Sequence, residues 1–132
     1  MSIELHTPAS LVVIPVIRAV AADLAARASF EVNSSDDLRM ALDDACAMLV
    51  HIAAEGATLS CRLTVWPERI EAVADVDIED GAQAQPIESF GWRVLECLAE
   101  EVKTYAVPAQ PGHRRRVRIT LGRQAVTALP WD

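Results

Sequence analysis

The sequence predicts an α+β fold, a two-layer sandwich with helices on one face of a mostly antiparallel mixed sheet. In the first part of the chain, apolar residues recur at helical spacing through two long stretches. Later they alternate with polar residues in short stretches, which is the pattern of half-buried strands. No internal repeat and no linker interrupts this order. Residues 1–132 are therefore expected to form a single domain with a core of its own.

The first elements are expected to be a short strand and a helix. Residues 1–5 alternate in polarity and are predicted to form an edge strand. Residues 11–30 are rich in alanine and amphipathic, so they are predicted as a helix. Pro15 falls in the first turn of that helix, where the missing N–H group is harmless.

Residues 34–55 show the most regular helical pattern in the chain. Ser34 or Ser35 is expected to cap the first turn, and Gly56 is expected to end the helix. One side of this helix should be buried, because apolar residues recur there every three or four positions: Leu38, Leu42, Ala45, Leu49 and Ile52.

A hairpin and a long loop should follow. Residues 58–66 and 70–75 alternate like strands, and residues 67–69 between them suit a short turn. Residues 77–88 are polar and are predicted as a loop. Loops of this length in a compact domain often act as lids or binding loops.

The last part of the chain predicts a third helix and two further strands. The helix is expected over residues 90–102, with Ser89 as its cap. Strands are expected over residues 103–107 and 114–121, with a turn at 108–113 between them. Arg114, Arg115 and Arg116 open the second of these strands and are interpreted as the solvated start of an edge strand.

Composition excludes several classes of protein. The net charge of −7 argues against a nucleic-acid surface, which needs clustered Lys and Arg. No apolar run is long enough to cross a bilayer, and no leader pattern opens the chain, so we expect a soluble, cytoplasmic protein. The cysteines Cys46, Cys61 and Cys97 are far apart within apolar patterns and are interpreted as buried thiols.

Three segments of the chain resemble motifs of a known family, and they follow one another in the same order as in that family. Residues 37–51 read DLRMALDDACAMLVH, residues 73–75 read VAD, and residues 89–102 read SFGWRVLECLAEEV. They resemble the N box, the V-x-D box and the G-L-G-L-x-L-V-x-A-L-A-D-E-V segment of the anti-sigma factor serine/threonine kinases. This is the RsbW-like branch of the histidine-kinase-like (Bergerat) ATPases. The sequence most resembles the actinobacterial UsfX type, in which the boxes are also eroded.

The resemblance implies a set of site residues. Asp44 matches the acid that orients or deprotonates an attacking hydroxyl, and Met48 matches the asparagine that binds magnesium. Asp75 matches the aspartate that accepts a hydrogen bond from the adenine amino group. Ser89 and Gly91 match the two glycines of the third box, where amides at a helix N-terminus hold phosphate. Ser89 is itself a departure, since the family has glycine there.

Other departures concern the metal and the loop. The thioether of Met48 is a poor ligand for magnesium. Residues 76–79 replace the expected glycines, and Asp77, Glu79 and Asp80 add negative charge near the triphosphate position. Although Arg93 can reach toward phosphate, we expect ATP and magnesium binding to be weak or absent, and we predict no metal ligands.

The resemblance leaves two functions open. In the first, the chain is an anti-sigma factor that binds an alternative sigma factor and is countered by an anti-sigma-factor antagonist. In the second, it is an active kinase that phosphorylates the antagonist; a third alternative is another protein-interaction role. A homodimer is expected from the family and from an exposed sheet edge.

Each candidate residue also has a structural interpretation. Asp44 can be a solvated helix acid, since a carboxylate at its position either faces water or lines a cleft. Asp75 can simply end a strand, and Gly91 can serve packing. His51 is interpreted as a surface residue, because no acid or nucleophile lies at a recognisable spacing from it.

Overall fold

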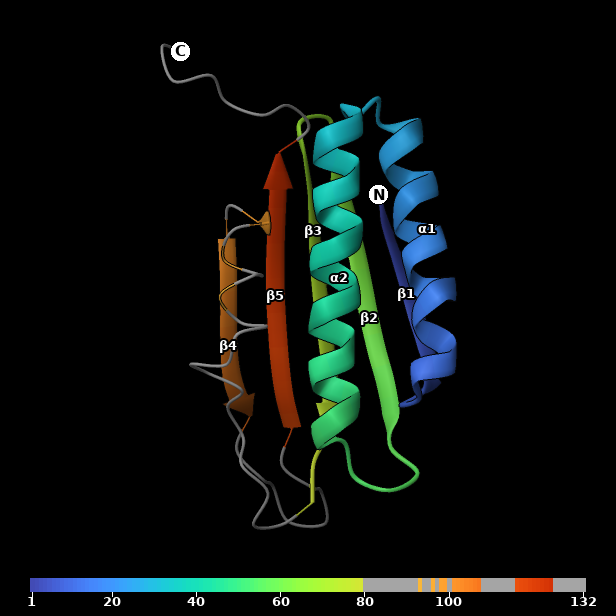
Figure 1. The fold of residues 1–132 in the computed structure, drawn as a ribbon, viewed down its shortest axis with the longest axis vertical. Helices are drawn as coiled ribbons and strands as arrows, with labels where there is room; N and C mark the ends of the chain where they lie inside the picture. The colour runs from blue at the N-terminus through green and yellow to red at the C-terminus, as the bar shows by residue number, and fades with distance from the viewer. Residues whose placement is uncertain (80–92, 94–95, 97, 100, 108–115, 125–132) are drawn as a thin grey trace.

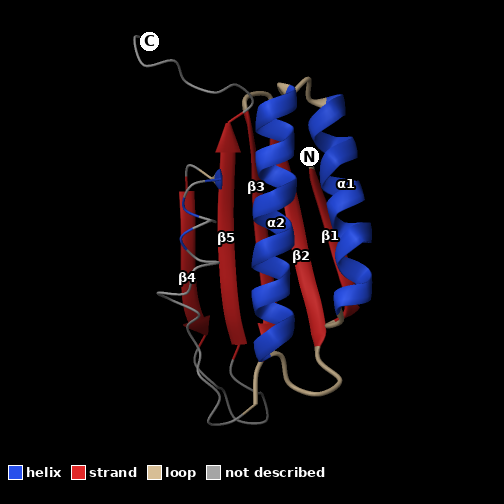
Figure 2. Ribbon diagram, in the orientation of Figure 1, coloured by secondary structure: helices blue, strands red, loops and turns tan. Residues whose placement is uncertain are grey.

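Two helices cover one face of a five-stranded antiparallel sheet in the computed structural model (Figure 1), which describes residues 1–79, 93, 96, 98–99, 101–107 and 116–124. The predicted α+β sandwich is confirmed, but the described strands pair only antiparallel, so the sheet is not mixed. Figure 2 shows the same two layers by secondary structure. The elements are β1 (Ser2–Pro8), a 3-10 turn (Leu11–Val13), α1 (Ile14–Arg27), α2 (Val32–Ile52), β2 (Thr58–Trp66), β3 (Arg69–Asp77), β4 (Glu101–Val107) and β5 (Arg116–Gln124).

The strand order is β1-β2-β3-β5-β4, so the last strand of the chain lies inside the sheet. β2 and β3 form the predicted hairpin, in which Trp66 opposes Arg69 across a two-residue turn. β5 then pairs with β3 on one side and with β4 on the other. The prediction that Arg116 starts an edge strand is therefore wrong, whereas β1 is an edge as predicted.

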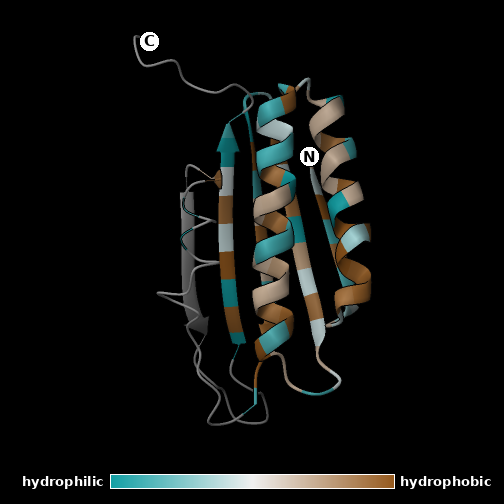
Figure 3. Cartoon of the chain, in the orientation of Figure 1, coloured by the Kyte–Doolittle hydropathy of each residue, from teal (hydrophilic) through white to brown (hydrophobic). Residues whose placement is uncertain are grey.

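The core lies between the helices and the sheet. Along each inner strand, every second side chain points toward the helices, which gives the alternation of brown and paler segments in Figure 3. The most deeply buried residues are aliphatic, as the composition predicts. They include Leu38, Leu42 and Leu49 of α2, and Leu59, Leu63, Ile70, Val76, Ile119 and Leu121 of the strands.

The start of α2 differs from the prediction. The helix begins at Val32, two residues before the expected cap, and Glu31 takes the N-cap position without a side-chain hydrogen bond. Ser34 is fully buried in the first turn, and its hydroxyl has no partner among the described residues. Ser34 is therefore a packed residue and not the cap.

The end of α2 is set by the sheet and not by glycine. Ala53 is extended and forms a bridge with Ile78, and the Ala54 N–H donates to the Asp77 carbonyl at 2.8 Å. These contacts pull the chain out of the helix after Ile52. Gly56, with a φ of 73°, supplies the turn into β2 and does not end the helix.

The predicted third helix is wrong at its C-terminal end. Arg93, Glu96 and Leu98 are helical, but Glu101–Val107 is strand β4 and pairs with β5. A helix cannot therefore extend to residue 102. Several predictions fall outside the described residues: the part of the predicted loop after residue 79, the site residues Ser89 and Gly91, and the turn at 108–113.

Two of the predicted buried thiols are confirmed. Cys46 and Cys61 are free and buried in the core. Burial raises the pKa of Cys61 to about 12 and that of Cys46 further, so both thiols stay neutral and unreactive near neutral pH. Cys97 lies outside the described residues. Within the described part of the chain, no helix is long and apolar enough to span a membrane.

The backbone conformation of Ser29, in the turn after α1, leads to a prediction about stability. Ser29 has a φ of 59°, in the left-handed region. Two hydrogen bonds hold the turn around it: the Ser29 N–H donates to the Ala26 carbonyl, and the Phe30 N–H donates to the Ala25 carbonyl. Because glycine takes this conformation without strain, Ser29→Gly should raise the free energy of unfolding by about 0.5–1 kcal/mol. Chemical denaturation measures the change. Ser29→Ala, which keeps the strain, should give no gain; an equal gain would contradict this account.

Candidate functional site

Asp44 lies on the side of α2 that faces away from α1. Its neighbour Asp43 points to α1, where its Oδ2 accepts from Arg18 Nη1 at 2.9 Å. Asp37, seven residues before Asp44 and so on the same helix side, reaches Arg123 of β5 at 2.9 Å. Asp44 therefore lies on the β5 side of α2, half-buried, with no hydrogen bond or ion pair to a described residue.

The environment of Asp44 disfavours its charge. Burial raises the pKa of its carboxyl above the ordinary 3.8, and the adjacent Asp43 carboxylate raises it further. A carboxyl of this kind is more readily protonated than a solvated one. A raised pKa at a half-buried carboxyl is the direction expected of a general acid or base.

This shift predicts how Asp44 affects stability with pH. Since the folded chain keeps the Asp44 proton to a higher pH than the unfolded chain, the free energy of unfolding falls as pH rises above 3.8. Asp44→Asn should therefore raise the melting temperature near neutral pH, and the gain should vanish below pH 3.8. Thermal unfolding followed by circular dichroism at both pH values measures this. Asp23→Asn, in an exposed pair with Arg27, should give no such gain.

Met48 lies one turn after Asp44, at the position that the resemblance assigns to a magnesium ligand. Its side chain is partly buried and packs against the hydrophobic core. Among the described residues, no group of three or more His, Cys, Asp or Glu side chains could hold a metal ion. The surroundings of Asp44 therefore do not fit magnesium, which prefers a set of oxygen ligands.

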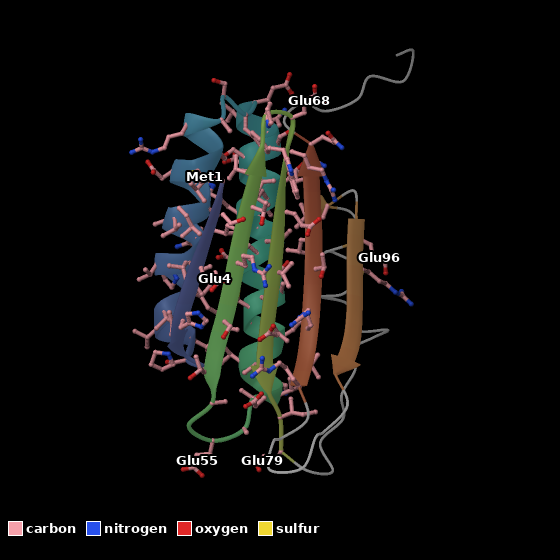
Figure 4. The ribbon with its side chains drawn as sticks, turned by 180° about the vertical axis from the view of Figure 1, so that it is seen from behind. Met1, Glu4, Glu55, Glu68, Glu79 and Glu96 are labelled. Atoms are coloured by element: carbon pink, nitrogen blue, oxygen red, sulfur yellow. The ribbon has the colours of Figure 1, made fainter. Side chains whose placement is uncertain are left out.

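Asp75 lies on the other face of the sheet. Its neighbours Ala74 and Val76 are buried in the core beneath the helices, and side chains alternate along a strand. Asp75 therefore projects from the face that no described helix covers, which is the face turned toward the viewer in Figure 4. The sheet separates it from Asp44, and the structure does not bring these two residues together.

The Asp75 carboxylate is held by arginines of β5. Only 8% of the residue is exposed, and its Oδ2 accepts from Arg118 Nε at 3.1 Å. Arg116 Nη1 lies 3.6 Å from Oδ1, and its Nε donates to Asp77 at 2.9 Å. Asp75, Arg116 and Arg118 border a shallow cavity of about 160 Å³, which is also lined by Arg62 of β2. Asp75 thus takes part in a charged cross-strand network.

The described residues do not fit a magnesium–ATP site that uses both carboxylates. One nucleotide cannot contact Asp44 above the sheet and Asp75 below it. In addition, the Asp75 carboxylate already accepts from guanidinium groups, whereas adenine recognition would need it free to accept from an amino group. Ser89 and Gly91 lie outside the described residues, so the phosphate-binding part stays a prediction.

Sequence reasoning missed Arg116 and Arg118 as partners of Asp75. Their signal is present in the sequence, because they stand two residues apart in an alternating strand and so share one face. The regular apolar positions Ile70, Ala72 and Ala74 likewise place Asp75 out of phase with the core face. Motif position alone gave no information about this face.

Comparison with known proteins identifies relatives. No family model matches the sequence. Over 111 residues the chain is 31% identical to the anti-sigma-F factor RsbW of Mycobacterium tuberculosis, in both strain CDC 1551 / Oshkosh and strain ATCC 25618 / H37Rv. The match covers 83% of this chain but 65% of those relatives, slightly less than two thirds of their length. The similarity confirms the resemblance that the three sequence segments predict: the chain is RsbW-like.

Proposed function

We propose that this chain is an anti-sigma factor of the cytoplasm that binds an alternative sigma factor, is countered by an anti-sigma-factor antagonist, and has degenerate ATP-binding boxes. The observation that carries the proposal is the similarity to anti-sigma-F factors over most of the chain. Under this proposal the fold is of the histidine-kinase-like ATPase type, used for binding a protein and not for phosphoryl transfer.

The placement of the matched residues supports degeneracy of the boxes. Phosphoryl transfer relies on metal ions to bridge the phosphates and neutralise charge, so a broken metal site is a severe defect. Met48 packs against the core at the ligand position, and Asp75 pairs with Arg118 on the far face of the sheet. Both observations favour a binding protein over an enzyme.

The test is co-expression of the chain with each alternative sigma factor of its organism. At least one should copurify in a stable complex, and the complex should fail to support transcription from promoters of that sigma factor. The housekeeping sigma factor serves as the control and should remain active. If no alternative sigma factor copurifies and none is inhibited, the proposal is wrong.

The active kinase is the second candidate, favoured by the half-buried Asp44 with its raised pKa. We expect no transfer from ATP to an antagonist serine under conditions in which an intact family member works. Met48→Asn should increase magnesium-dependent ATP binding, measured by calorimetry, more than it increases turnover, because it supplies an oxygen ligand. Met40→Asn, at an exposed methionine of the same helix, is the matched control. Transfer by the wild-type chain that depends on Asp44 would contradict the prediction.

A homodimer belongs to the same proposal. Among the described strands β1 pairs with β2 alone, so its other edge presents backbone groups suited to strand pairing. Light scattering at micromolar concentration should report twice the chain mass of 14.3 kDa. A strictly monomeric protein across that concentration range would argue against the dimer.

A further inference from the structure

Apolar side chains line one lateral side of the sandwich, where β1 ends the described sheet and α1 ends the helix layer (Figure 1, and from behind in Figure 4). Arg18 marks the side of α1 that faces α2, because it pairs with Asp43 of that helix. Val16 and Val20 stand two residues before and after Arg18, a rotation of about 200° on a helix, so both face away from α2. Val16 is 57% exposed, and Val20 is half-buried. The outer side of α1 is therefore apolar and only partly covered by the described residues.

The edge strand continues this apolar side into the sheet. Ile3 and Leu5 pair with Leu63 and Cys61 of β2, whose side chains are buried beneath the helices. Since directly opposed residues share a face, Ile3 and Leu5 point toward the helices as well, yet both stay only partly buried. Apolar groups thus lie at the open side of both layers. The region is named the β1–α1 side and consists of Ile3, Leu5, Val16 and Val20.

The backbone of β1 directs hydrogen-bonding groups to the same side. The Met1 amino group donates to the Val65 carbonyl at 3.2 Å, and the Val65 N–H donates to the Met1 carbonyl at 2.8 Å. Because such pairs alternate along an antiparallel ladder, the odd residues of β1 bond to β2, whereas Glu4 and His6 turn their N–H and C=O groups to the outer edge. No described strand occupies that edge. Pro8, the next even residue, has no N–H group, so the usable stretch is short.

The outer edge of β1 is complementary to a second copy of itself in one register. Antiparallel pairing about a two-fold axis at Leu5 sets Glu4 opposite His6 of the second copy, so a carboxylate faces an imidazole and each pair exchanges two backbone hydrogen bonds. An axis at Glu4 would set two carboxylates opposite each other, which is unfavourable. An axis at His6 would set Glu4 opposite Pro8, which lacks a donor. An axis between two residues would turn the helices of the two copies to opposite faces of the joined sheet.

The axis at Leu5 also brings the apolar sides of the two α1 helices together. β1 and α1 run in opposite directions, because the 3-10 turn reverses the chain between them (Figure 1). The residues from Pro8 back to Leu5 span about 10 Å, and roughly six or seven helical residues from Ile14 span the same length. The middle of β1 therefore lies level with the turns of α1 that carry Val16 and Val20. Since α1 packs on β2, one strand in from the edge, the joined sheet leaves space for both helices.

We propose that two copies of this chain pair along β1 in the register centred on Leu5 and pack Val16 and Val20 of their α1 helices across the same two-fold axis. That the chain forms a homodimer rests on the proposed function; the edge, the register and the helix contact rest on the described residues. The backbone hydrogen bonds fix the register, and burial of the valines and of Ile3 contributes the hydrophobic part of the affinity. The result is one sheet that continues through both copies, with the helices of both on one face.

The first measurement tests the register by disulfide cross-linking of the full chain. Leu5→Cys places two thiols opposite each other on the axis, where facing Cα atoms lie about 4.5 Å apart, a distance that a disulfide spans. Glu4→Cys, at the neighbouring residue, is the matched control, because its two thiols would lie diagonally, with Cα atoms about 7–8 Å apart. With diamide as the oxidant, Leu5→Cys should give the covalent dimer about tenfold faster than Glu4→Cys on a non-reducing gel. The wild-type chain, with its own three cysteines, gives the background rate.

The second measurement tests the helix contact through the dissociation constant of the dimer, from light scattering over a concentration series. Val16→Glu puts two carboxylates at the contact between the α1 helices and should weaken dimerisation about a hundredfold. Met40→Glu, at a similarly exposed apolar residue of α2, is the matched control and should dimerise as the wild type does. Because the Val16 side chain is more than half exposed in the single chain, its substitution should leave the circular-dichroism spectrum unchanged.

The outcomes separate this inference from the proposed function. A wild-type chain that stays monomeric overturns both the interface and the homodimer, whereas copurification with a sigma factor decides the anti-sigma role independently. A dimer that persists in Val16→Glu, with equal cross-linking of the two cysteine variants, overturns the interface alone. Faster cross-linking of Glu4→Cys would contradict the register. Loss of sigma-factor binding in Val16→Glu while the dimer persists would assign the β1–α1 side to the sigma factor and would also overturn the inference.

Discussion

Asp75→Ala is expected to lower the free energy of unfolding by about 2–3 kcal/mol, because it removes a nearly buried carboxylate that contacts two arginines. The guanidinium groups of Arg118 and Arg116 would lose their shared acceptor on the open face of the sheet. Chemical denaturation of the full chain without nucleotide measures the loss. A role of Asp75 confined to adenine binding predicts no such change in the absence of nucleotide.

Asp77→Ala is the matched control for Asp75→Ala. Asp77 lies on the same strand and the same face, but it is more exposed, and among the described residues its carboxylate pairs with one arginine, Arg116, at 2.9 Å. Exposed ion pairs contribute little, so its loss should cost less than about 1 kcal/mol. Equal effects of the two substitutions would contradict the view that burial of Asp75 makes its pairing important.

Leu49→Ala should cause the largest loss of stability, about 3 kcal/mol, or about 10 °C in melting temperature. Leu49 is fully buried between α2 and the sheet, and truncation leaves a cavity that the surrounding strands cannot fill. Thermal unfolding followed by circular dichroism measures the change, and a loss of less than about 1 kcal/mol would contradict the buried placement of Leu49.

Met40→Ala on the same helix is the control for Leu49→Ala. Its side chain is mostly exposed, so its truncation should change the free energy of unfolding by no more than about 0.5 kcal/mol. The contrast between the two positions tests which side of α2 faces the core.

The periodicity of apolar residues predicts an element and its bounds correctly where the local pattern and the tertiary contacts agree. Residues 58–66 were predicted as a strand, and β2 has the same bounds. α2 was predicted as the central helix, but its ends differ, because burial of Ser34 and the bridge between Ala53 and Ile78 are contacts with distant segments. The third helix was extended too far because the pairing of β4 with β5 cannot be read from residues 90–102 alone.

The candidate site was predicted less well than the fold. Family position located Asp44 on α2 correctly, and its raised pKa is a property that only the folded environment supplies. The same approach grouped Asp44 with Asp75, although strand alternation places Asp75 beneath the sheet. A motif gives the position of a residue along the chain, whereas the phase of the neighbouring apolar residues decides which face it occupies.

The position of β5 inside the sheet has a consequence for synthesis of the protein. β5 joins β3 to β4 and supplies Val117, Ile119 and Leu121 to the core beneath α2. A growing chain that ends before residue 116 can therefore form the β2–β3 hairpin and the helices, but it leaves the inner edge of β3 unpaired and apolar surface uncovered. Folding has to wait for long-range pairing, which is slow compared with local pairing. During translation the exposed β3 edge would be a site for chaperones, and premature termination in this region would produce aggregating fragments and not a partly active protein.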